Sequence, residues 1–196
     1  MNTKPLLSSK GTIIKGPLII QPRIYPDQRG WFIESWNQRQ FDNAVGRQVV
    51  FSQDNHSQSS LGVLRGLHYQ LPPFTQEKLV RATSGHIFDV VVDLRNKSPT
   101  FGQWGGTDLT SENKAQLWVP TGFAHGFLAI SEVTEVQYKS SGYWNKNYER
   151  TIRWDDTYLS IAWPQDRLKG SKINASTKDL EAASFQTAVN VGDLFP

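Results

Sequence analysis

Short runs of β-branched and aromatic residues, broken every few positions by Gly, Pro, Asn or Ser, dominate this chain. Runs of this length between turn residues are typical of β-strands. Many short strands at regular spacing predict two packed sheets or a barrel, since each strand must bury its apolar face against a second layer. The predicted strands are 18–20, 49–51, 63–70, 79–81, 87–94, 101–106, 116–120, 127–130, 133–139 and 151–154.

Helical patterns are few. Residues 37–45 have apolar positions at helical spacing and end before Gly46, which favours a helix stop. A second predicted helix covers residues 179–189 after a candidate cap at Ser176. We therefore expect an all-β fold with a few short peripheral helices.

Length and composition indicate one domain over residues 1–196. The 38% hydrophobic and 12% aromatic fractions argue against disorder, and no linker or repeat divides the chain. Residues 165–196 are expected to form a peripheral C-terminal segment. The chain has no cysteine, which excludes disulfides, thiolate metal sites and a cysteine nucleophile.

The net charge of +3 suits an anionic ligand such as a nucleoside diphosphate. Because the Lys and Arg residues are scattered along the chain, we do not expect binding to nucleic acid. No stretch approaches the roughly 18 apolar residues of a membrane span, and residues 1–15 lack the apolar core of a signal peptide. We expect no membrane association and a cytoplasmic protein.

Only four histidines are available for acid–base chemistry: His56, His68, His86 and His125. His68 lies in the predicted strand 63–70, three positions after Arg65, and regular alternation would point these two side chains to opposite faces. Gly66 lies between them, and a glycine inside a strand often marks a bulge. We predict an irregularity at Gly66 that brings Arg65 and His68 onto one face.

The segment from Pro120 to Phe127 resembles the second motif of cupin jelly rolls. Metal-binding cupins also carry His-x-His in a first motif, and the matching place here has His68 followed by Tyr69 and Gln70. A catalytic metal needs about three protein ligands, so the chain predicts a metal-free pocket. Lys78 supplies a cation if it shares the inward face of its strand; the alternative is a solvated lysine.

A further resemblance rests on an ordered series of segments, at 29–35, 51–57, 63–70, 88–93, 98–102, 112–114, 116–120, 122–127, 138–139 and 176–179. This series is similar to the dTDP-4-dehydrorhamnose 3,5-epimerase family. The resemblance implies a cupin-like jelly roll that forms a homodimer, with a strand in residues 1–30 exchanged or packed at the interface. It also implies a cofactor-independent isomerase that converts dTDP-4-keto-6-deoxyglucose to dTDP-4-keto-rhamnose, a precursor of lipopolysaccharide or other cell-surface carbohydrate.

The C4 ketone of such a substrate acidifies the C–H bonds at C3 and C5, and inversion needs a base and an acid on opposite faces of the ring. By resemblance His68 is the base, Tyr138 is the acid and Asp179 holds the other ring nitrogen of His68. An unperturbed histidine pKa of about 6.5 leaves a neutral base near pH 7. Asp179 also lies in the first turn of a predicted helix, where a carboxylate is favourable without any catalytic role.

The resemblance assigns the other substrate contacts to Arg29, Glu34, Gln53, Asn55, Arg65, His125, Tyr143, Glu149 and Lys178. Gly142 departs from the family, which commonly has a polar residue there, and this leaves the shape of the pocket wall open. Three alternatives therefore remain: an epimerase or ketoisomerase acting at a single centre, a sugar-binding jelly roll without activity, and a metal-dependent cupin.

Overall fold

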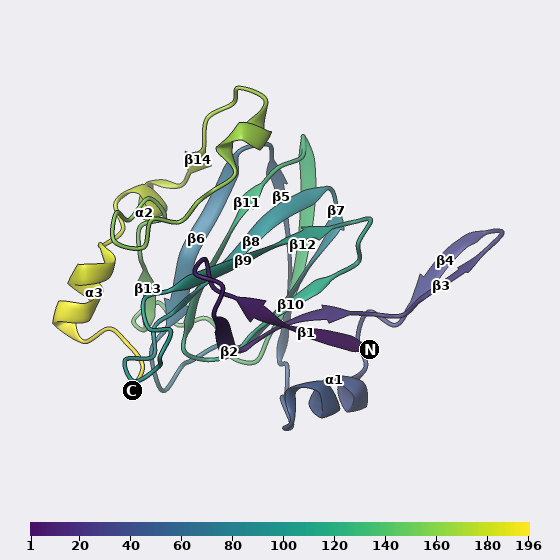
Figure 1. Cartoon of the computed structure of the whole chain (residues 1–196), viewed down its shortest axis with the longest axis horizontal. Coiled ribbons are helices and arrows are strands. Elements are labelled where there is room, and N and C mark those ends of the chain that lie inside the picture. The colour runs from purple at the N-terminus through teal and green to yellow at the C-terminus, as the bar shows by residue number, and fades with distance from the viewer.

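The computed structural model describes residues 1–196 as two antiparallel sheets that face each other (Figure 1). The first sheet has the order β1 (Asn2–Leu7), β2 (Ile13–Gln21), β10 (Gln116–Val119), β7 (Lys78–Ser84), β12 (Val133–Ser140) and β5 (Gln53–Ser60). The second has the order β13 (Glu149–Thr151), β6 (Val63–Gln70), β11 (Phe123–Ala129), β8 (His86–Asp93) and β9 (Trp104–Thr110), and the short β14 (Asn174–Ala175) pairs with β6. The all-β prediction is confirmed.

The main core lies between the sheets, where alternate residues of the facing strands interdigitate. Val80 and Val136 of the first sheet pack here with Val91 and Phe127 of the second. The two valines that flank Val91 point the other way and join a second cluster, so β8 is buried on both faces. This double burial explains the three consecutive valines of β8, Val90 to Val92.

Each sheet has its own cover on the outer face. The C-terminal segment covers the second sheet through η1 (Gln165–Leu168), α2 (Thr177–Leu180) and α3 (Phe185–Val191), with Trp163 and Phe185 buried against it. Helix α1 (Gln38–Val45) covers one end of the first sheet, where Phe41 packs edge-on against Trp118 at 5.0 Å between ring centroids. None of these helices is long and apolar enough to cross a membrane.

The first predicted helix is confirmed. The Asn37 side chain accepts a hydrogen bond from the Gln40 N–H, and Gly46 ends the helix in the left-handed conformation. The second prediction, one helix over residues 179–189, is wrong. The chain forms two short helices instead, because Ser176 caps α2 and Ser184 caps α3 as a new start.

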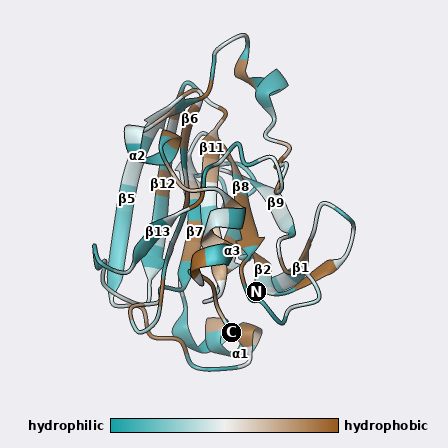
Figure 2. Cartoon of the chain, turned by 90° about the vertical axis from the view of Figure 1, so that its left-hand side faces the viewer, coloured by the Kyte–Doolittle hydropathy of each residue, from teal (hydrophilic) through white to brown (hydrophobic).

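The strand predicted at residues 49–51 is also wrong. Val49 is buried, but it packs with Phe41 and Trp118 beneath α1 and joins no ladder. The strand that follows, β5, is polar throughout and was not predicted, and Figure 2 shows it as a hydrophilic ribbon beside the apolar central strands. Because β5 is an edge strand, its outward face needs no apolar residues.

A two-stranded hairpin, β3 (Ile24–Asp27) with β4 (Gly30–Ile33), stands apart from both sheets. Figure 1 shows it projecting away from the body of the chain. Its aromatic side chains are mostly exposed, with Trp31 at 55% and Phe32 at 64% of full exposure. Large apolar side chains grouped at such a position mark a surface for interaction.

Candidate active site

A cavity of about 450 Å³ opens between the two sheets. Strands β6 and β11 form one wall, β7 and β12 form the other, and residues 174–179 close one side. Seven of the predicted site residues line this cavity, namely Arg65, His68, Lys78, His125, Tyr138, Lys178 and Asp179. Residues far apart in the sequence therefore share one site.

The predicted irregularity in β6 is present. His68 lies opposite His125 and Arg65 lies opposite Phe127, so three steps along β6 match two along β11. The extra residue brings Arg65 and His68 onto the cavity face, as the sequence predicted. Gly66 permits this path because its φ is +134° and a side chain there would lie 2.5 Å from the Cα of Gly126.

Replacing Gly66 by Ala is expected to destabilise the fold by about 3 kcal/mol, from backbone strain and the close approach to β11. The free energy of unfolding in urea measures this loss. Gly170→Ala is the matched control, because that glycine also has a positive φ but its added methyl group meets nothing within 4 Å. Equal losses in the two variants would contradict the close-approach explanation.

His68 and Asp179 form a close pair, with 2.6 Å between Nε2 and Oδ1. The Ser176 hydroxyl donates to the second carboxylate oxygen at 2.9 Å. Burial opposes ionisation of Asp179, but His68, Ser176 and the Gly66 N–H together hold its pKa below the ordinary value. An ionised carboxylate accepts a hydrogen bond from Nε2, which makes Nδ1 the acceptor nitrogen of a neutral ring. Asp179 makes this contact from the first turn of α2. Its pairing with His68 and its favourable position near the start of a helix are therefore compatible.

Lys78 and Tyr138 come from the opposite wall. The Lys78 ammonium lies 5.9 Å from the centre of the Tyr138 ring, and both side chains line the cavity. The inward orientation of Lys78 is confirmed, so the solvated alternative is wrong. Burial lowers the pKa of Lys78 to about 8. Burial also raises the pKa of Tyr138, so this hydroxyl keeps its proton at neutral pH.

A second histidine–carboxylate pair was missed by the sequence interpretation. His125 Nε2 lies 2.7 Å from Oδ1 of Asp89, which is fully buried in β8. Burial lowers the pKa of His125, so its ring is neutral at pH 7 despite the carboxylate. An acidic residue between apolar neighbours of a strand was the available signal, because acidic residues are almost never fully buried without a partner.

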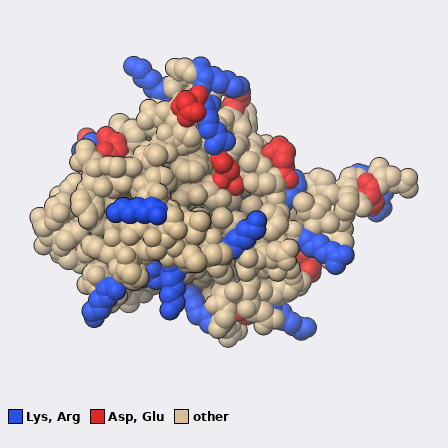
Figure 3. Space-filling view, viewed as in Figure 1, with Lys and Arg blue, Asp and Glu red and all other residues tan.

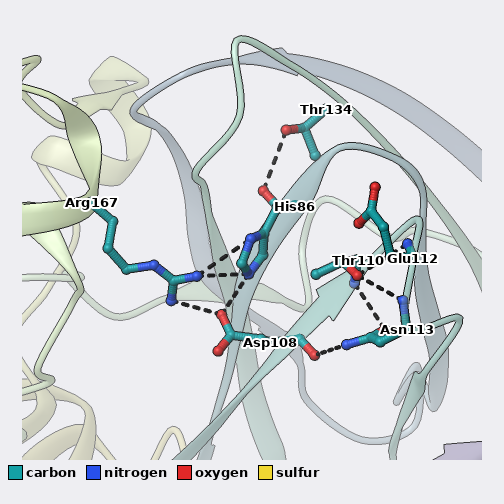
Figure 4. Close-up of polar contacts among 7 residues, drawn as sticks. All are labelled: His86, Asp108, Thr110, Glu112, Asn113, Thr134 and Arg167. Atoms are coloured by element: carbon teal, nitrogen blue, oxygen red, sulfur yellow. Dashed lines mark hydrogen bonds and ion pairs between the residues drawn. The ribbon is translucent and has the colours of Figure 1, made fainter.

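The other two histidines lie outside this cavity. His56 contacts Glu135 on the outer face of the first sheet at 3.1 Å. His86 contacts Asp108 at 2.7 Å, and Arg167 reaches both of them (Figure 4). This network ties η1 to β8 and β9, which indicates a structural role.

Four further residues assigned by resemblance, Gln53, Asn55, Tyr143 and Glu149, do not line the cavity. Glu149 pairs at 2.6 Å with Lys178, which does line it, and the Gln53 amide donates to Asn55 at 2.7 Å on β5. Tyr143 is 69% exposed, and its backbone carbonyl accepts from the buried amide of Gln70 at 3.1 Å. Gln70, at the position of the missing cupin histidine, thus holds a loop rather than a metal.

Gly142 also has a structural explanation. A side chain at this position would lie 2.9 Å from the backbone carbonyl of Thr75, so the two loops meet too closely for a larger residue. The Gly142 carbonyl accepts from the side chains of Gln76 and Ser140. The glycine at this position, where the family commonly has a polar residue, therefore coincides with close packing of these two loops.

Arg29 and Glu34 do not line the cavity of their own chain either. Arg29 lies on the β3–β4 hairpin and pairs with Asp27 at 2.7 Å, and Glu34 accepts hydrogen bonds from Asn37 and Gln40. Figure 3 shows the hairpin with its few charges at the far end, and the other Lys and Arg residues scattered over this face. Arg29 and Arg65 therefore do not converge within one chain.

No group of three or more His, Cys, Asp or Glu side chains is arranged to hold a metal ion. The two histidines of the cavity, one from β6 and one from β11, are instead each bonded to a carboxylate. This arrangement suits proton transfer beside a fixed cation better than metal ligation.

Comparison with known proteins gives a consistent result. The family model of dTDP-4-dehydrorhamnose 3,5-epimerase matches residues 11–187. An enzyme of that name from Shigella flexneri is 51% identical over 175 residues, which are 89% of this chain and 97% of the relative. A solved dTDP-6-deoxy-D-glucose-3,5-epimerase of Legionella pneumophila, in complex with dTDP-4-keto-L-rhamnose, is 41% identical with a TM-score of 0.87 and covers 99% of this chain and 98% of its own. An epimerase structure from Mycobacterium tuberculosis is 38% identical with a TM-score of 0.92, covering 100% and 94%. These likenesses confirm the jelly-roll prediction.

Proposed function

The chain belongs to the dTDP-4-dehydrorhamnose 3,5-epimerase family, and from that premise we propose that it converts dTDP-4-keto-6-deoxyglucose to dTDP-4-keto-rhamnose by inverting C3 and C5. One observation carries the proposal: His68 from one sheet and Tyr138 from the other line the same cavity, with Lys78 beside Tyr138. A sugar ring held between these walls has a base on one face and an acid on the other. The activity is that of an isomerase in dTDP-rhamnose biosynthesis.

In this mechanism Nδ1 of the neutral His68 removes the proton from C3 or C5. The C–H electron pair moves into the ring to form an enolate, with the negative charge on the ketone oxygen. The Lys78 ammonium stabilises that charge. Tyr138 then gives its proton to the opposite face of the same carbon, and both residues exchange protons with solvent before the second carbon reacts.

Lys78 sets the alkaline limit of this reaction. Its pKa is lowered to about 8, so the ammonium is present below that pH and lost above it. We expect kcat/KM to fall with a midpoint near this pH, and Lys78→Met to lower kcat by about 10²- to 10³-fold, as for the loss of one oxyanion donor. Steady-state rates between pH 6 and 10 measure both effects.

Lys78→Arg is the control, because a guanidinium stays charged throughout this pH range. Its residual activity is expected to lack the alkaline limb. An alkaline limb that persists at the same pH in Lys78→Arg would assign the titration to another group.

For the nucleotide end of the substrate, we propose Arg65 and Lys178 as the diphosphate contacts, because both cations line the cavity. Glu149 supports Lys178 through their ion pair. Gln53, Asn55 and Tyr143 contact the base and sugar by family resemblance, and His125 contacts the hexose.

We further propose a homodimer in which the hairpin of one subunit reaches the cavity of the other. The exposed Trp31 and Phe32 supply apolar surface for that contact. The same contact would bring Arg29 and Glu34 to the cavity of the other subunit. Light scattering tests the assembly. The charged diphosphate of the substrate does not cross a bilayer unaided, which favours an enzyme in the compartment that makes nucleotide sugars, the cytoplasm.

Product analysis tests the proposed function. Incubation with dTDP-4-keto-6-deoxyglucose is expected to give a product inverted at both carbons, identified by proton NMR coupling constants. A product inverted at C3 or C5 alone would select the single-centre alternative, and unchanged substrate would contradict the proposal.

A further inference from the structure

The segment 113–116, which leads into β10, holds the β3–β4 hairpin at both of its ends. The Asn113 carbonyl accepts from the Gln21 amide at 2.7 Å, where β2 ends and the chain enters the hairpin. The buried amide of Gln116 donates to the Ser35 carbonyl at 2.8 Å, just after β4. This one segment therefore fixes the two points at which the hairpin leaves the body of the chain.

Between these two contacts, Lys114 reaches the hairpin itself. Its ammonium lies 3.7 Å from the centre of the Trp31 ring, well inside the range of a cation–π interaction. Both residues line a second cavity, of about 190 Å³, together with residues 81–83 of β7. The other cation of this cavity, Arg81, donates to Gln137. Lys114 therefore links the hairpin to the loop before β10.

The loop that carries Lys114 is itself fixed by hydrogen bonds. The Asn113 side chain accepts from the Thr110 N–H at 3.1 Å and donates to the Asp108 carbonyl at 2.9 Å (Figure 4). The Lys114 N–H donates to the Thr110 carbonyl, and Lys114 has a φ of +55°, in the left-handed region. The ammonium that contacts Trp31 is thus carried by an ordered turn.

The two faces of the hairpin differ in what they contact. Trp31 lies opposite Pro26 and Phe32 lies opposite Tyr25, so these two pairs project to opposite faces. The Trp31 face contacts Lys114 of its own chain, which leaves Phe32, at 64% exposure, on the other face. A partner subunit would meet the Phe32 face, and the Lys114 contact behind it sets the angle of the hairpin.

We propose that Lys114 is a positioning residue for substrate binding in trans, because it holds the hairpin at the angle at which Arg29 and Glu34 reach the cavity of the partner subunit. The inference rests on the proposed function and its homodimer and deepens both. It names a residue outside the cavity on which the affinity for the nucleotide sugar depends. It also gives a role to residues 112–114, a segment that resembles the family but does not line the cavity.

Lys114→Asn tests the proposal, because asparagine tolerates the left-handed backbone and is too short to reach the Trp31 ring. Without the cation–π contact the angle of the hairpin can vary. The Kd of dTDP and the KM of the substrate are expected to rise about tenfold, while kcat changes less than about twofold. Calorimetry with dTDP and steady-state rates measure these values, and the temperature of unfolding should not fall. An unchanged Kd for dTDP would overturn the proposal.

Lys169→Asn is the matched control. Lys169 also has a left-handed backbone, with a φ of +52°, but its exposed side chain pairs with Glu132 at 3.8 Å. This variant should leave Kd and KM unchanged. Lys114→Arg keeps a cation for the Trp31 ring and should restore most of the affinity. A loss of affinity in Lys114→Arg or in Lys169→Asn as large as that in Lys114→Asn would contradict a role for the cation.

Mixed dimers separate action in trans from action in cis. When a Lys114→Asn chain pairs with a His68→Asn chain, the working cavity belongs to the first chain and receives the hairpin of the second, whose Lys114 is intact. KM should then equal that of the unmodified enzyme. When a chain with both substitutions pairs with an unmodified chain, the working cavity receives the loosened hairpin, and KM should rise about tenfold. The opposite assignment would overturn the action in trans.

Light scattering on each variant completes the test, and every variant should remain a dimer. Dissociation of Lys114→Asn into monomers would overturn the positioning role, since the contact would then serve assembly. A monomeric unmodified enzyme would overturn both the homodimer and this inference. An unmodified enzyme that binds dTDP but leaves the substrate unchanged would defeat the proposed function, and an active dimer whose affinity does not respond to Lys114→Asn would defeat only the role of Lys114.

Discussion

Replacing His68 by Asn is expected to lower kcat/KM by about 10⁴-fold, the upper range for one general base. The reason is that the same ring abstracts both protons, and the amide of Asn cannot accept a proton at neutral pH. Exchange of the substrate protons at C3 and at C5 should disappear together. Proton NMR of the substrate in deuterated water follows the two positions separately.

The matched control is His86→Asn, which removes a histidine of the surface network with Asp108 and Arg167. It should leave both exchange rates unchanged. If His68→Asn retained exchange at one carbon, that proton would have another base, and a single histidine could not serve both centres.

Tyr138→Phe is expected to slow product formation by about 10²- to 10³-fold while the substrate still exchanges with solvent. The variant keeps His68, Asp179 and Lys78, so the enolate still forms. Without the hydroxyl, a proton returns mainly from His68 to the face it left, which exchanges the hydrogen without inverting the carbon. The ratio of exchange to product, read in one NMR time course, should therefore rise sharply.

Tyr69→Phe is the control for this ratio, because the Tyr69 hydroxyl donates to the Asp193 carbonyl behind the second sheet and not into the cavity. Its ratio should match that of the unmodified enzyme. An equal decline of exchange and product in Tyr138→Phe would mean that Tyr138 supports enolate formation and is not the acid of the opposite face.

The sequence predicted strands best where one or both faces are buried. The runs that became β6, β8 and β12 were predicted within a residue or two, because their apolar residues follow the packing. It failed at β5, where an edge position permits polar residues on both faces, and at Val49, whose burial comes from α1. The apolar character of a segment indicates that the segment is buried. Whether it also pairs with a neighbouring strand has to be inferred from that burial.

The site was predictable in a similarly uneven way. The bulge that unites Arg65 and His68 was predicted from Gly66 alone. Asp179 lies 111 positions from His68, so no local pattern could pair them, and that pairing came from family resemblance. Neither the local pattern nor the family resemblance pointed to Asp89, because its partner His125 lies 36 positions further along the chain and only the fold brings the two side chains together.

The most direct test of the two-wall mechanism is one proton NMR time course of dTDP-4-keto-6-deoxyglucose with the enzyme in deuterated water. The proposed mechanism predicts that deuterium enters at both C3 and C5 and that the product inverted at both carbons contains it at both positions. Inverted product that retains its original hydrogen at either carbon, or a substrate that shows no exchange at all, would contradict it.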